Sequence, residues 1–338
     1  MDSTADATSA VGTTADDTSA GERGADARAP VTTDSNEPPM SIVEQTLRSQ
    51  RESWREISER VSKLGTTEFP HEPAKRILLF GVGSSHHAAR LTAFALLRDK
   101  LRLRVPVIAC SSNSIGNDVI PQKGDWVFAF SHRGGTPVTR QALKVCDQVG
   151  AFPMLVCGKD APGAREIESA RMVLETVEME RVEPHTASVT GAICAVTSLL
   201  MGAKAVEEWD ALRSIGNPDL EYFRVKAGEG PTAIVGEWEA EWIAREGALK
   251  FMEMARLPVR AYGTEEYFHG PRQSLGEYER LWHVSLAKDP RNDDLKPDYR
   301  IGVFGASPLA WIPALVELQW LALATAFNRG VDPDGLQG

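Results

Sequence analysis

Short, uniformly apolar runs alternate with longer amphipathic stretches along most of the chain. In the first half, the apolar runs are residues 77–80, 107–109, 126–130, 154–157 and 172–174. The stretches 85–100 and 136–149 lie between them and carry apolar residues at helical spacing. Because continuous apolar strands alternating with helices are typical of a parallel sheet that is covered on both faces, we predict such a sheet here.

Two further helices are predicted on either side of this series. From residue 42 to 64, apolar residues such as Leu47, Trp54 and Val61 recur at helical spacing between charged ones. This periodicity predicts an amphipathic helix that precedes the first strand. The apolar stretch 186–207 is predicted to be one long helix that closes the lobe.

A second, shorter series of the same kind follows. Its predicted strands are residues 233–235, 259–262, 282–287 and 301–304, and its predicted helices are 238–256 and 311–327. The similar order of elements indicates an internal duplication, with the second copy abbreviated between residues 287 and 301. We therefore predict an α/β protein of two lobes, each a flavodoxin-like three-layer arrangement with a parallel sheet flanked by helices.

The chain is predicted to divide into four segments. These are a disordered acidic tail at 1–39, a first lobe with its N-terminal helix at 40–207, a linker at 208–228 and a second lobe at 229–338. The tail is rich in small polar residues and carries eight acidic side chains against two basic ones. Such a segment has too little apolar surface to offset the entropy lost on folding.

Charge and cysteine content narrow the classes of function. A net charge of −10 argues against nucleic acid as the main partner. Four cysteines without CxxC spacing predict free thiols in a reducing compartment, with no metal site. The apolar stretch 306–327 contains Glu317 and Gln319, which favours a buried core helix over a membrane span. Since the N-terminus also has no apolar signal segment, we expect a cytoplasmic protein without a membrane partner.

Two predicted strand-to-helix turns carry the chemistry of an anion site. Residues 81–85 read Gly-Val-Gly-Ser-Ser, and residues 131–136 read Ser-His-Arg-Gly-Gly-Thr. A helix N-terminus offers free N–H groups and a partial positive charge, while Ser and Thr hydroxyls add donors. One such turn alone is explained by ordinary helix capping. Two turns at adjacent strands favour a phosphate site.

A charged stripe and a histidine stand out in the second lobe. Glu246, Lys250 and Glu253 follow one another at i, i+4 and i+7, so they share one face of the predicted helix. Taken alone, this pattern is equally typical of a solvated, salt-bridged face. His269 precedes Gly-Pro and is predicted to lie in a loop; a surface role without chemistry explains it as well.

Together these segments resemble the double sugar isomerase (SIS) architecture over roughly residues 41–335. That architecture forms the isomerase half of glucosamine-6-phosphate synthase and also stand-alone phosphosugar isomerases, deaminases and fructosamine-phosphate deglycases. The most specific match is Glu-Gly-Ala-Leu-Lys-x-x-Glu at 246–253, followed by His-Gly-Pro at 269–271. The pattern Ser-x-x-Gly-x-Thr at 131–136 and the segment 185–188 are looser matches.

The resemblance implies a role for each matching residue. Glu253 would be the base that moves a proton between C1 and C2, through an enediol or enolamine. Glu246 and Lys250 would orient the substrate and tune Glu253, and His269 would reach in from a second subunit to help open the sugar ring. The sugar phosphate would be held by Ser84, Ser85, Ser131, Arg133, Gly134, Thr136, Thr186 and Ser188. No cofactor is implied, and the expected assembly is a homodimer or higher oligomer with a shared active site.

Departures from the family pattern shape the expected reaction. Position 2 is Asp, where a glutamine-hydrolysing domain needs a nucleophilic Cys, so glutamine-driven amination by this chain alone is not expected. The lysine that a synthase tail would carry near the sugar carbonyl has no counterpart in residues 336–338. Arg133 stands where the synthase has a smaller polar residue. It could bind a phosphate or carboxylate in a bidentate way, or it could be a surface arginine.

Three functions remain open from the sequence. The first is an aldose–ketose isomerase or amino-sugar-phosphate deaminase that acts on a six-carbon sugar phosphate. The second is a fructosamine-phosphate deglycase, in which Arg133 would contact a carboxylate on the amine portion. The third is a sugar-phosphate sensor that binds without turnover.

Overall fold

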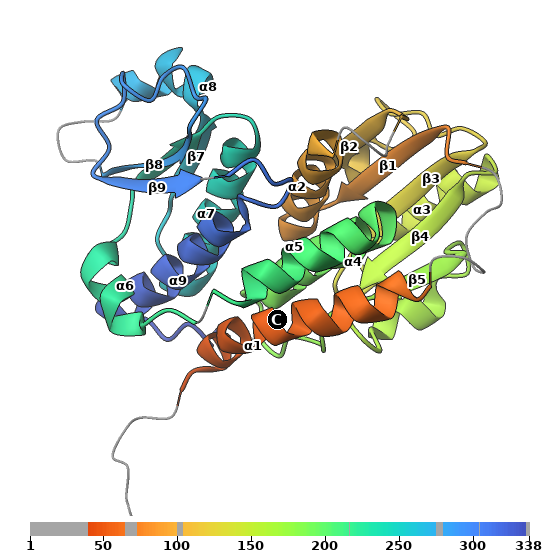
Figure 1. Ribbon diagram of the computed structural model, residues 1–338, viewed down its shortest axis with the longest axis horizontal. Helices are drawn as coiled ribbons and strands as arrows, with labels where there is room; N and C mark the ends of the chain where they lie inside the picture. The colour runs from red at the N-terminus through yellow and green to blue at the C-terminus, as the bar shows by residue number, and fades with distance from the viewer. Residues whose placement is uncertain are drawn as a thin grey trace, which may run out of the picture. The chain divides into compact units, whose positions relative to one another are not determined.

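Five parallel strands form the first sheet, as the alternating pattern predicts. The computed structural model describes residues 40–64, 73–99, 104–215, 217–274, 280–303 and 305–335, so the predicted tail, residues 1–39, lies outside the described residues. The strands are β1 (Arg76–Gly81), β2 (Val107–Ser111), β3 (Asp125–Phe130), β4 (Phe152–Cys157) and β5 (Met172–Glu175). Their order across the sheet is β2-β1-β3-β4-β5 (Figure 1).

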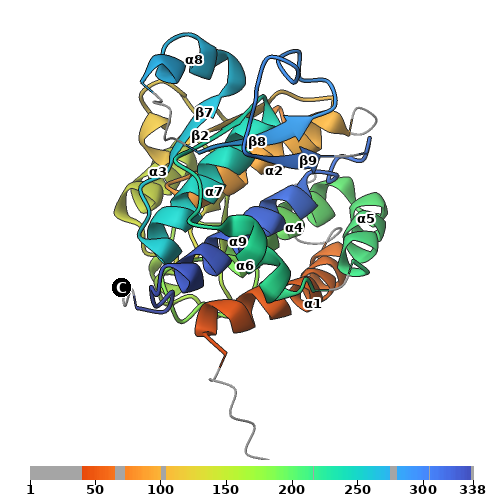
Figure 2. The ribbon, with the colours of Figure 1, turned by 90° about the vertical axis from the view of Figure 1, so that its left-hand side faces the viewer.

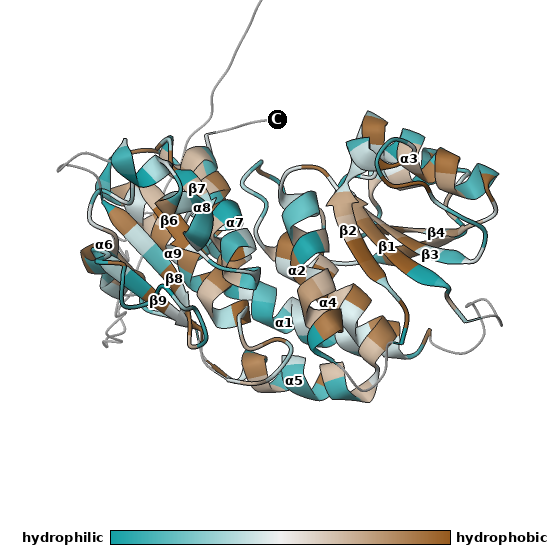
Figure 3. Ribbon diagram, turned by 90° about the horizontal axis from the view of Figure 1, so that it is seen from above, coloured by the Kyte–Doolittle hydropathy of each residue, from teal (hydrophilic) through white to brown (hydrophobic). Residues whose placement is uncertain are grey.

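Helices cover both faces of this sheet. The helices of the lobe are α1 (Ile42–Ser62), α2 (Ser84–Arg98), α3 (Pro137–Gln148), α4 (Ala187–Met201) and α5 (Ala203–Arg213). Ile77 and Leu79 on β1 pack into a core with α1, α2 and α4, whereas Leu78 and Phe80 pack into a second core with α3. Successive residues of a strand point to opposite faces, so an unbroken apolar run is what a doubly covered strand requires. Figure 3 shows β1 and β2 as largely apolar ribbons between these helices.

The prediction of one helix over 186–207 was wrong, because a glycine divides it. Gly202 has φ +65°, a conformation that glycine adopts readily and that ends a helix. Its N–H donates to the carbonyl of Ser198 and caps α4, and α5 starts at the next residue. The segment predicted as a linker at 208–228 contains the end of α5 and all of α6 (Leu220–Ala227).

The second lobe repeats the first in a shorter form. Its strands are β6 (Ala233–Gly236), β7 (Arg260–Gly263), β8 (Leu281–Leu286) and β9 (Tyr299–Val303), all parallel in the order β7-β6-β8-β9. Its further helices are α7 (Glu239–Ala255), α8 (Thr264–Phe268) and α9 (Ile312–Asn328). No helix joins β8 to β9 within the described residues, whereas α3 joins β3 to β4. The predicted two-lobe α/β class, with an abbreviated second lobe, is confirmed.

Equivalent turns of the two lobes share one backbone geometry. A Cβ added to Gly81 at the end of β1 would lie 2.5 Å from the carbonyl carbon of Ser85, and one added to Gly236 at the end of β6 would lie 2.6 Å from that of Ala240. Each helix therefore packs directly on the strand that precedes it. The residues capping α2 and α7, Gly83 and Trp238, have similar positive φ angles of 57° and 53°.

Helices carry the contact between the lobes. Helix α2 packs against α7, and Arg98 at the end of α2 pairs with Glu239 at the start of α7. Helix α9 lies alongside α7 (Figure 2). Gln319 on α9 donates to the backbone carbonyl of Thr186, which precedes α4. The prediction of a buried helix at 306–327 holds for α9, and no described helix is long and apolar enough to cross a membrane.

Short 3₁₀ turns and free thiols complete the described structure. The turns are η1 (Ser112–Ser114), η2 (Pro162–Glu166) and η3 (Pro271–Gln273). All four cysteines are free thiols, as predicted, and Cys146, Cys157 and Cys194 are buried. Burial raises the pKa of the Cys146 and Cys157 thiols to about 12, so neither behaves as a reactive thiolate.

Candidate active site

The first predicted anion turn brings hydroxyls to the start of α2. Gly81 ends β1, and Gly83 at φ +57° turns the chain into the helix. The next residues, Ser84 and Ser85, both line a small pocket at the carboxyl ends of the strands. Ligands bind in this crevice in open α/β sheets, because the helix N-termini converge there.

The second turn supplies a buried hydroxyl to the same pocket. Ser131 follows β3 and lines the pocket, and its Oγ lies 3.1 Å from the Oγ1 of Thr136 at the N-cap of α3. Gly134 has φ +66°, and a Cβ on it would lie 2.7 Å from the backbone nitrogen of Ala164 in η2. Packing on η2 is therefore a sufficient reason for glycine at this position.

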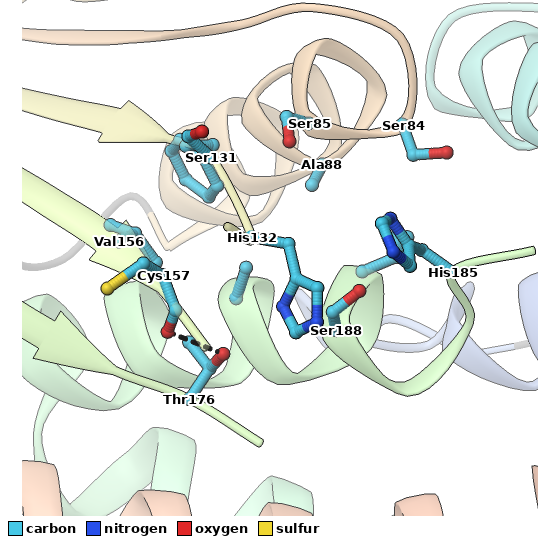
Figure 4. Close-up of a pocket in the computed structure, with 13 residues that line it drawn as sticks. Ser84, Ser85, Ala88, Ser131, His132, Val156, Cys157, Thr176, His185 and Ser188 are labelled. Carbon is cyan, nitrogen blue, oxygen red and sulfur yellow. Dashed lines mark hydrogen bonds between the residues drawn. The ribbon is translucent and has the colours of Figure 1, made fainter. Parts of the chain in front are cut away.

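Side chains from five segments of the first lobe line the pocket: the start of α2, the ends of β3 and β4, the residue after β5, and the segment that leads into α4 (Figure 4). The polar lining residues are Ser84, Ser85, Ser131, His132, Thr176, His185 and Ser188. No lysine or arginine is among its lining residues within the described part of the chain. An anion bound here would rely on hydroxyl, imidazole and backbone N–H donors.

No motif in the sequence marks Glu180, but its side chain caps the start of α4. Its buried carboxylate accepts hydrogen bonds from the backbone N–H of Thr186 (2.9 Å) and of Ser188 (2.7 Å). It also accepts one from the Thr186 hydroxyl. The predicted residues Thr186 and Ser188 therefore have their backbone donors engaged by the chain, and the hydroxyl of Ser188 lines the pocket.

Arg133 pairs with an acidic residue from a different segment. Its guanidinium lies 3.1 Å from the carboxylate of Glu183, and both side chains are partly exposed. Glu183 is also close enough to Glu253 to raise the pKa of that carboxyl. The pair therefore links the second anion turn of the first lobe to the predicted base of the second.

The charged stripe of α7 forms a buried network that joins the lobes. Lys250 donates to Glu253 at 2.6 Å and lies 3.3 Å from Glu246. Ser84 connects this network to α2, because its hydroxyl accepts from Lys250 and donates to Glu246, each at 3.0 Å. His87, one helical turn after Ser84, has its Nδ1 2.7 Å from the second oxygen of Glu246.

Burial and neighbouring charges shift the pKa values of the three stripe residues in different directions. Burial would raise the pKa of Glu246, but Lys250 and the hydrogen bonds from His87 and Ser84 outweigh it and lower the pKa. Burial opposes the charged form of Lys250, yet Glu246 and Glu253 raise its pKa. Burial raises the pKa of Glu253, with Lys250 acting against it. Glu253 is the most exposed of the three, at 26% of its side chain, and so the best placed to meet a substrate.

His269 lies apart from this network within the chain. It caps the end of α8, its side chain is 81% exposed, and its Nε2 lies 3.8 Å from Glu265. The structure thus places Ser84, Ser85, Ser131 and Ser188 in one pocket and joins Ser84 to Glu246, Lys250 and Glu253 on α7. Thr136 reaches the pocket through Ser131, Arg133 pairs with Glu183, Thr186 is bound to Glu180, and Gly134 packs on η2. Glu180, Glu183, His87, His132 and His185 join them. Helical spacing from Ser84 is a signal that could have identified His87 in the sequence.

Comparison with known proteins finds relatives in sequence and in fold. No family model matches the chain. The glutamine–fructose-6-phosphate aminotransferase (isomerizing) of Pyrobaculum aerophilum is 27% identical over 83% of this chain and 55% of its own length. The chain spans about half the length of the curated relatives it matches.

Solved structures share the fold. The C-terminal domain of glucosamine-fructose-6-phosphate aminotransferase from Francisella tularensis superposes with a TM-score of 0.70 at 16% identity, covering 90% of this chain and 99% of that one. Tagatose-6-phosphate ketose/aldose isomerase from Escherichia coli gives a TM-score of 0.67 at 16% identity, covering 87% and 95%. At these identities the likeness is one of fold.

Proposed function

We propose that the chain belongs to the double-SIS family, whose fold it shares, and that it is a phosphosugar aldose–ketose isomerase or amino-sugar-phosphate deaminase. One observation carries the proposal. Ser84, at the start of α2 in the first lobe, is hydrogen-bonded to Lys250, which pairs with Glu253 of the second lobe. One buried network thus joins the helix start proposed to hold the phosphate to the carboxylate proposed as the base. Positioning of this kind can supply several kcal/mol of catalysis.

Glu253 is the proposed base. In the isomerase reaction its carboxylate takes the proton from C1 of a ketose, and the carbonyl oxygen at C2 takes a proton from solvent to become a hydroxyl of the enediol. Glu253 then returns its proton to C2, while the C1 hydroxyl releases its proton to solvent and becomes the carbonyl of the aldose. Because burial raises the pKa of Glu253, the carboxyl is better matched to proton exchange near neutral pH than an exposed glutamate is.

The phosphate is proposed to bind at the two anion turns. Ser85 and Ser131 line the pocket, and Thr136 hydrogen-bonds to Ser131, so hydroxyl donors gather where α2 and α3 begin. Lys250 and Glu246 then hold Glu253 beside the reacting carbons. The proposed reaction uses neither glutamine nor a cofactor, and the proposed location is the cytoplasm.

His269 is proposed to act in the site of a second copy of the chain. Its exposed ring at the end of α8 is free to reach a neighbouring subunit and assist opening of the sugar ring. A homodimer with shared sites is the simplest assembly of this kind. Mixing Glu253→Gln and His269→Ala chains should restore part of the activity. No recovery after demonstrated subunit exchange would contradict a shared site.

Isotope exchange tests the proposed reaction directly. The protein is incubated in D₂O with fructose 6-phosphate, glucose 6-phosphate or glucosamine 6-phosphate, and NMR follows deuterium at C1 or C2. Exchange on at least one ester is expected. Tight binding of an ester without any exchange would instead identify a sugar-phosphate sensor, and neither binding nor exchange would contradict both functions.

The Arg133–Glu183 pair favours a deglycase as the second candidate. A fructosamine phosphate whose amine portion is an amino acid would bring a carboxylate that competes with Glu183 for Arg133. Loss of amino-acid release in Arg133→Ala, with isotope exchange on fructose 6-phosphate retained, would support this function. Arg140→Ala is the matched control, because Arg140 forms a similar pair with Glu166, whereas it is Glu183, the partner of Arg133, that acts on Glu253.

A further inference from the structure

Two histidine rings meet edge to face in the pocket. His132 follows Ser131 in the second anion turn, and His185 belongs to the segment 177–186 that leads into α4. Their ring centroids lie 4.7 Å apart at an interplanar angle of 66°. Figure 4 shows both rings among the serines of the pocket. Among the described residues, they are the two histidines that line it.

His132 is held in one tautomer by the backbone. Its Nε2 lies 3.0 Å from the backbone nitrogen of Glu180, and since an N–H can only donate, Nε2 is the acceptor and Nδ1 carries the proton. Its own carbonyl accepts from the N–H of Gly158 at 2.8 Å. Burial lowers the pKa of His132 to about 4; Glu180 opposes the shift, whereas His185 and Arg133 add to it. His132 is therefore neutral and fixes segment 177–186 against the strand ends.

His185 offers a ring nitrogen that the described chain does not satisfy. Its Nε2 is buried and has no hydrogen-bond partner among the described residues. Native proteins seldom leave such a group without a partner, which costs about 1–3 kcal/mol. The charged groups around it are Glu180, Glu183, Lys250 and Arg133, and burial lowers its pKa. A neutral donor or acceptor thus lies between the anion turns and the network of Lys250.

We propose that His185 is a positioning and specificity residue, which hydrogen-bonds a sugar hydroxyl between the phosphate and the reacting carbons. The assignment rests on the proposed function, because it presumes a phosphosugar in this pocket. His132 acts through His185 by holding its ring and its segment in place. The substrate class is therefore a phosphosugar with a free hydroxyl at a middle carbon, and an analogue without that hydroxyl should bind more weakly.

Binding measurements that need no turnover test this role. Calorimetry is carried out with inorganic phosphate and with fructose 6-phosphate on the wild type, His185→Phe and His185→Asn. In His185→Phe the affinity for fructose 6-phosphate should fall about tenfold, the size of one lost hydrogen bond in a buried site, while that for phosphate changes less than about twofold. Asn keeps a polar group and should recover part of the loss. His86→Asn is the control, since His86 is a ring-stacked neutral histidine outside the pocket.

The outcomes separate this role from the proposed function. Equal losses for phosphate and fructose 6-phosphate in His185→Phe would show a structural role and overturn the assignment. Unchanged affinity for both ligands would also overturn it and leave the proposed function standing. If the wild type bound phosphate but no phosphosugar, both inferences would fall. In turnover, the supporting result is a rise in KM that exceeds the fall in kcat.

Discussion

The two lobes share one strand-to-helix turn but place residues of different charge on it. In each, a glycine ends the first strand of the crossover, and the next helix packs against it at a spacing that excludes a side chain. In the first lobe that helix opens with Ser84, Ser85 and two histidines, which suit an anion. In the second it opens with Glu237 and Glu239, which repel one. The shared geometry packs each helix on its strand, and the residues at the helix start make the two turns chemically different.

The lobes also differ at the next strand. In the first lobe, β3 leads through Ser131 and His132, which line the pocket, into α3. In the second, β8 leads into a helix-free segment where buried Asp289 lies 3.3 Å from His283 and accepts from Thr264. The second lobe has no second helix start at this point, and its charged groups lie in the middle of α7. In the proposed function, the first lobe therefore binds the phosphate and the second supplies the base for proton transfer.

The largest effect is expected from removing the proposed base of the second lobe. Glu253→Gln keeps the shape and the hydrogen bond to Lys250 but cannot accept a proton. Isotope exchange should fall about 10³-fold, within the usual range for a general base, while sugar-phosphate affinity stays within about threefold of the wild type. Glu241→Gln makes the same change on the same helix, where the carboxylate pairs with Arg245, and serves as the control. Equal activity of the two variants would contradict the proposal that the second lobe supplies the base through Glu253.

The buried cation between the lobes is expected to dominate stability. Lys250→Met leaves Glu246 charged and fully buried without its ammonium partner. Removing one partner of such a pair costs about 3–5 kcal/mol of the free energy of unfolding, measured by urea denaturation. The double variant Glu246→Gln/Lys250→Met should recover part of the loss. A loss below about 1 kcal/mol in the single variant would show that the network does not bind the lobes together.

Because the two turns share one geometry, replacing the glycine of either turn by alanine should lower the free energy of unfolding by a similar amount. Gly81→Ala and Gly236→Ala would each place a Cβ within 2.6 Å of backbone, and each should cost about 3 kcal/mol of unfolding free energy. Gly83→Ala meets no neighbour and should cost only about 1 kcal/mol, the strain of its positive φ. A cost of Gly236→Ala far below that of Gly81→Ala would break the equivalence of the turns.

The smallest expected effect is a shift of the acid limb in the dependence of kcat/KM on pH. Because burial raises the pKa of Glu253, the carboxylate is protonated at a higher pH than an ordinary glutamate and then cannot accept a proton. The exchange rate measured as kcat/KM should therefore decline, as pH falls, at a pH above the usual glutamate range. Lys250 opposes this shift, so Lys250→Met should move the limb to still higher pH. A limb at the ordinary glutamate value would contradict the burial of the base.

Periodicity alone predicted most of the fold. Short, mainly apolar runs identified all nine strands of the described structure, and the runs of the first sheet are uniformly apolar because strands buried on both faces leave little room for polar residues. The stripe Glu246, Lys250 and Glu253 was found in the same way, since helical spacing places these residues on one face. The break at Gly202 was missed, because a glycine inside an apolar run does not reveal its φ angle.

Contacts between distant segments could not be predicted from spacing. Spacing marked Ser84 as a helix-start hydroxyl, but it gave no sign that this hydroxyl is shared with Glu246 and Lys250, more than 160 positions away in the chain. Glu180 stands in a segment without periodicity, and nothing near it in the sequence indicates that its carboxylate caps α4. Such partners are decided by how the lobes and segments pack.

The carboxylate of Glu180 has a consequence for which molecules the pocket accepts. It fills the start of α4 with the protein's own negative charge, so that helix cannot hold a second anion. A substrate with one charged end would therefore bind in a single orientation, with the charged end at the serines and the other end towards α7. A molecule phosphorylated at both ends would meet Glu180, Glu183 and Glu253 with its second group, and the pocket should discriminate against it.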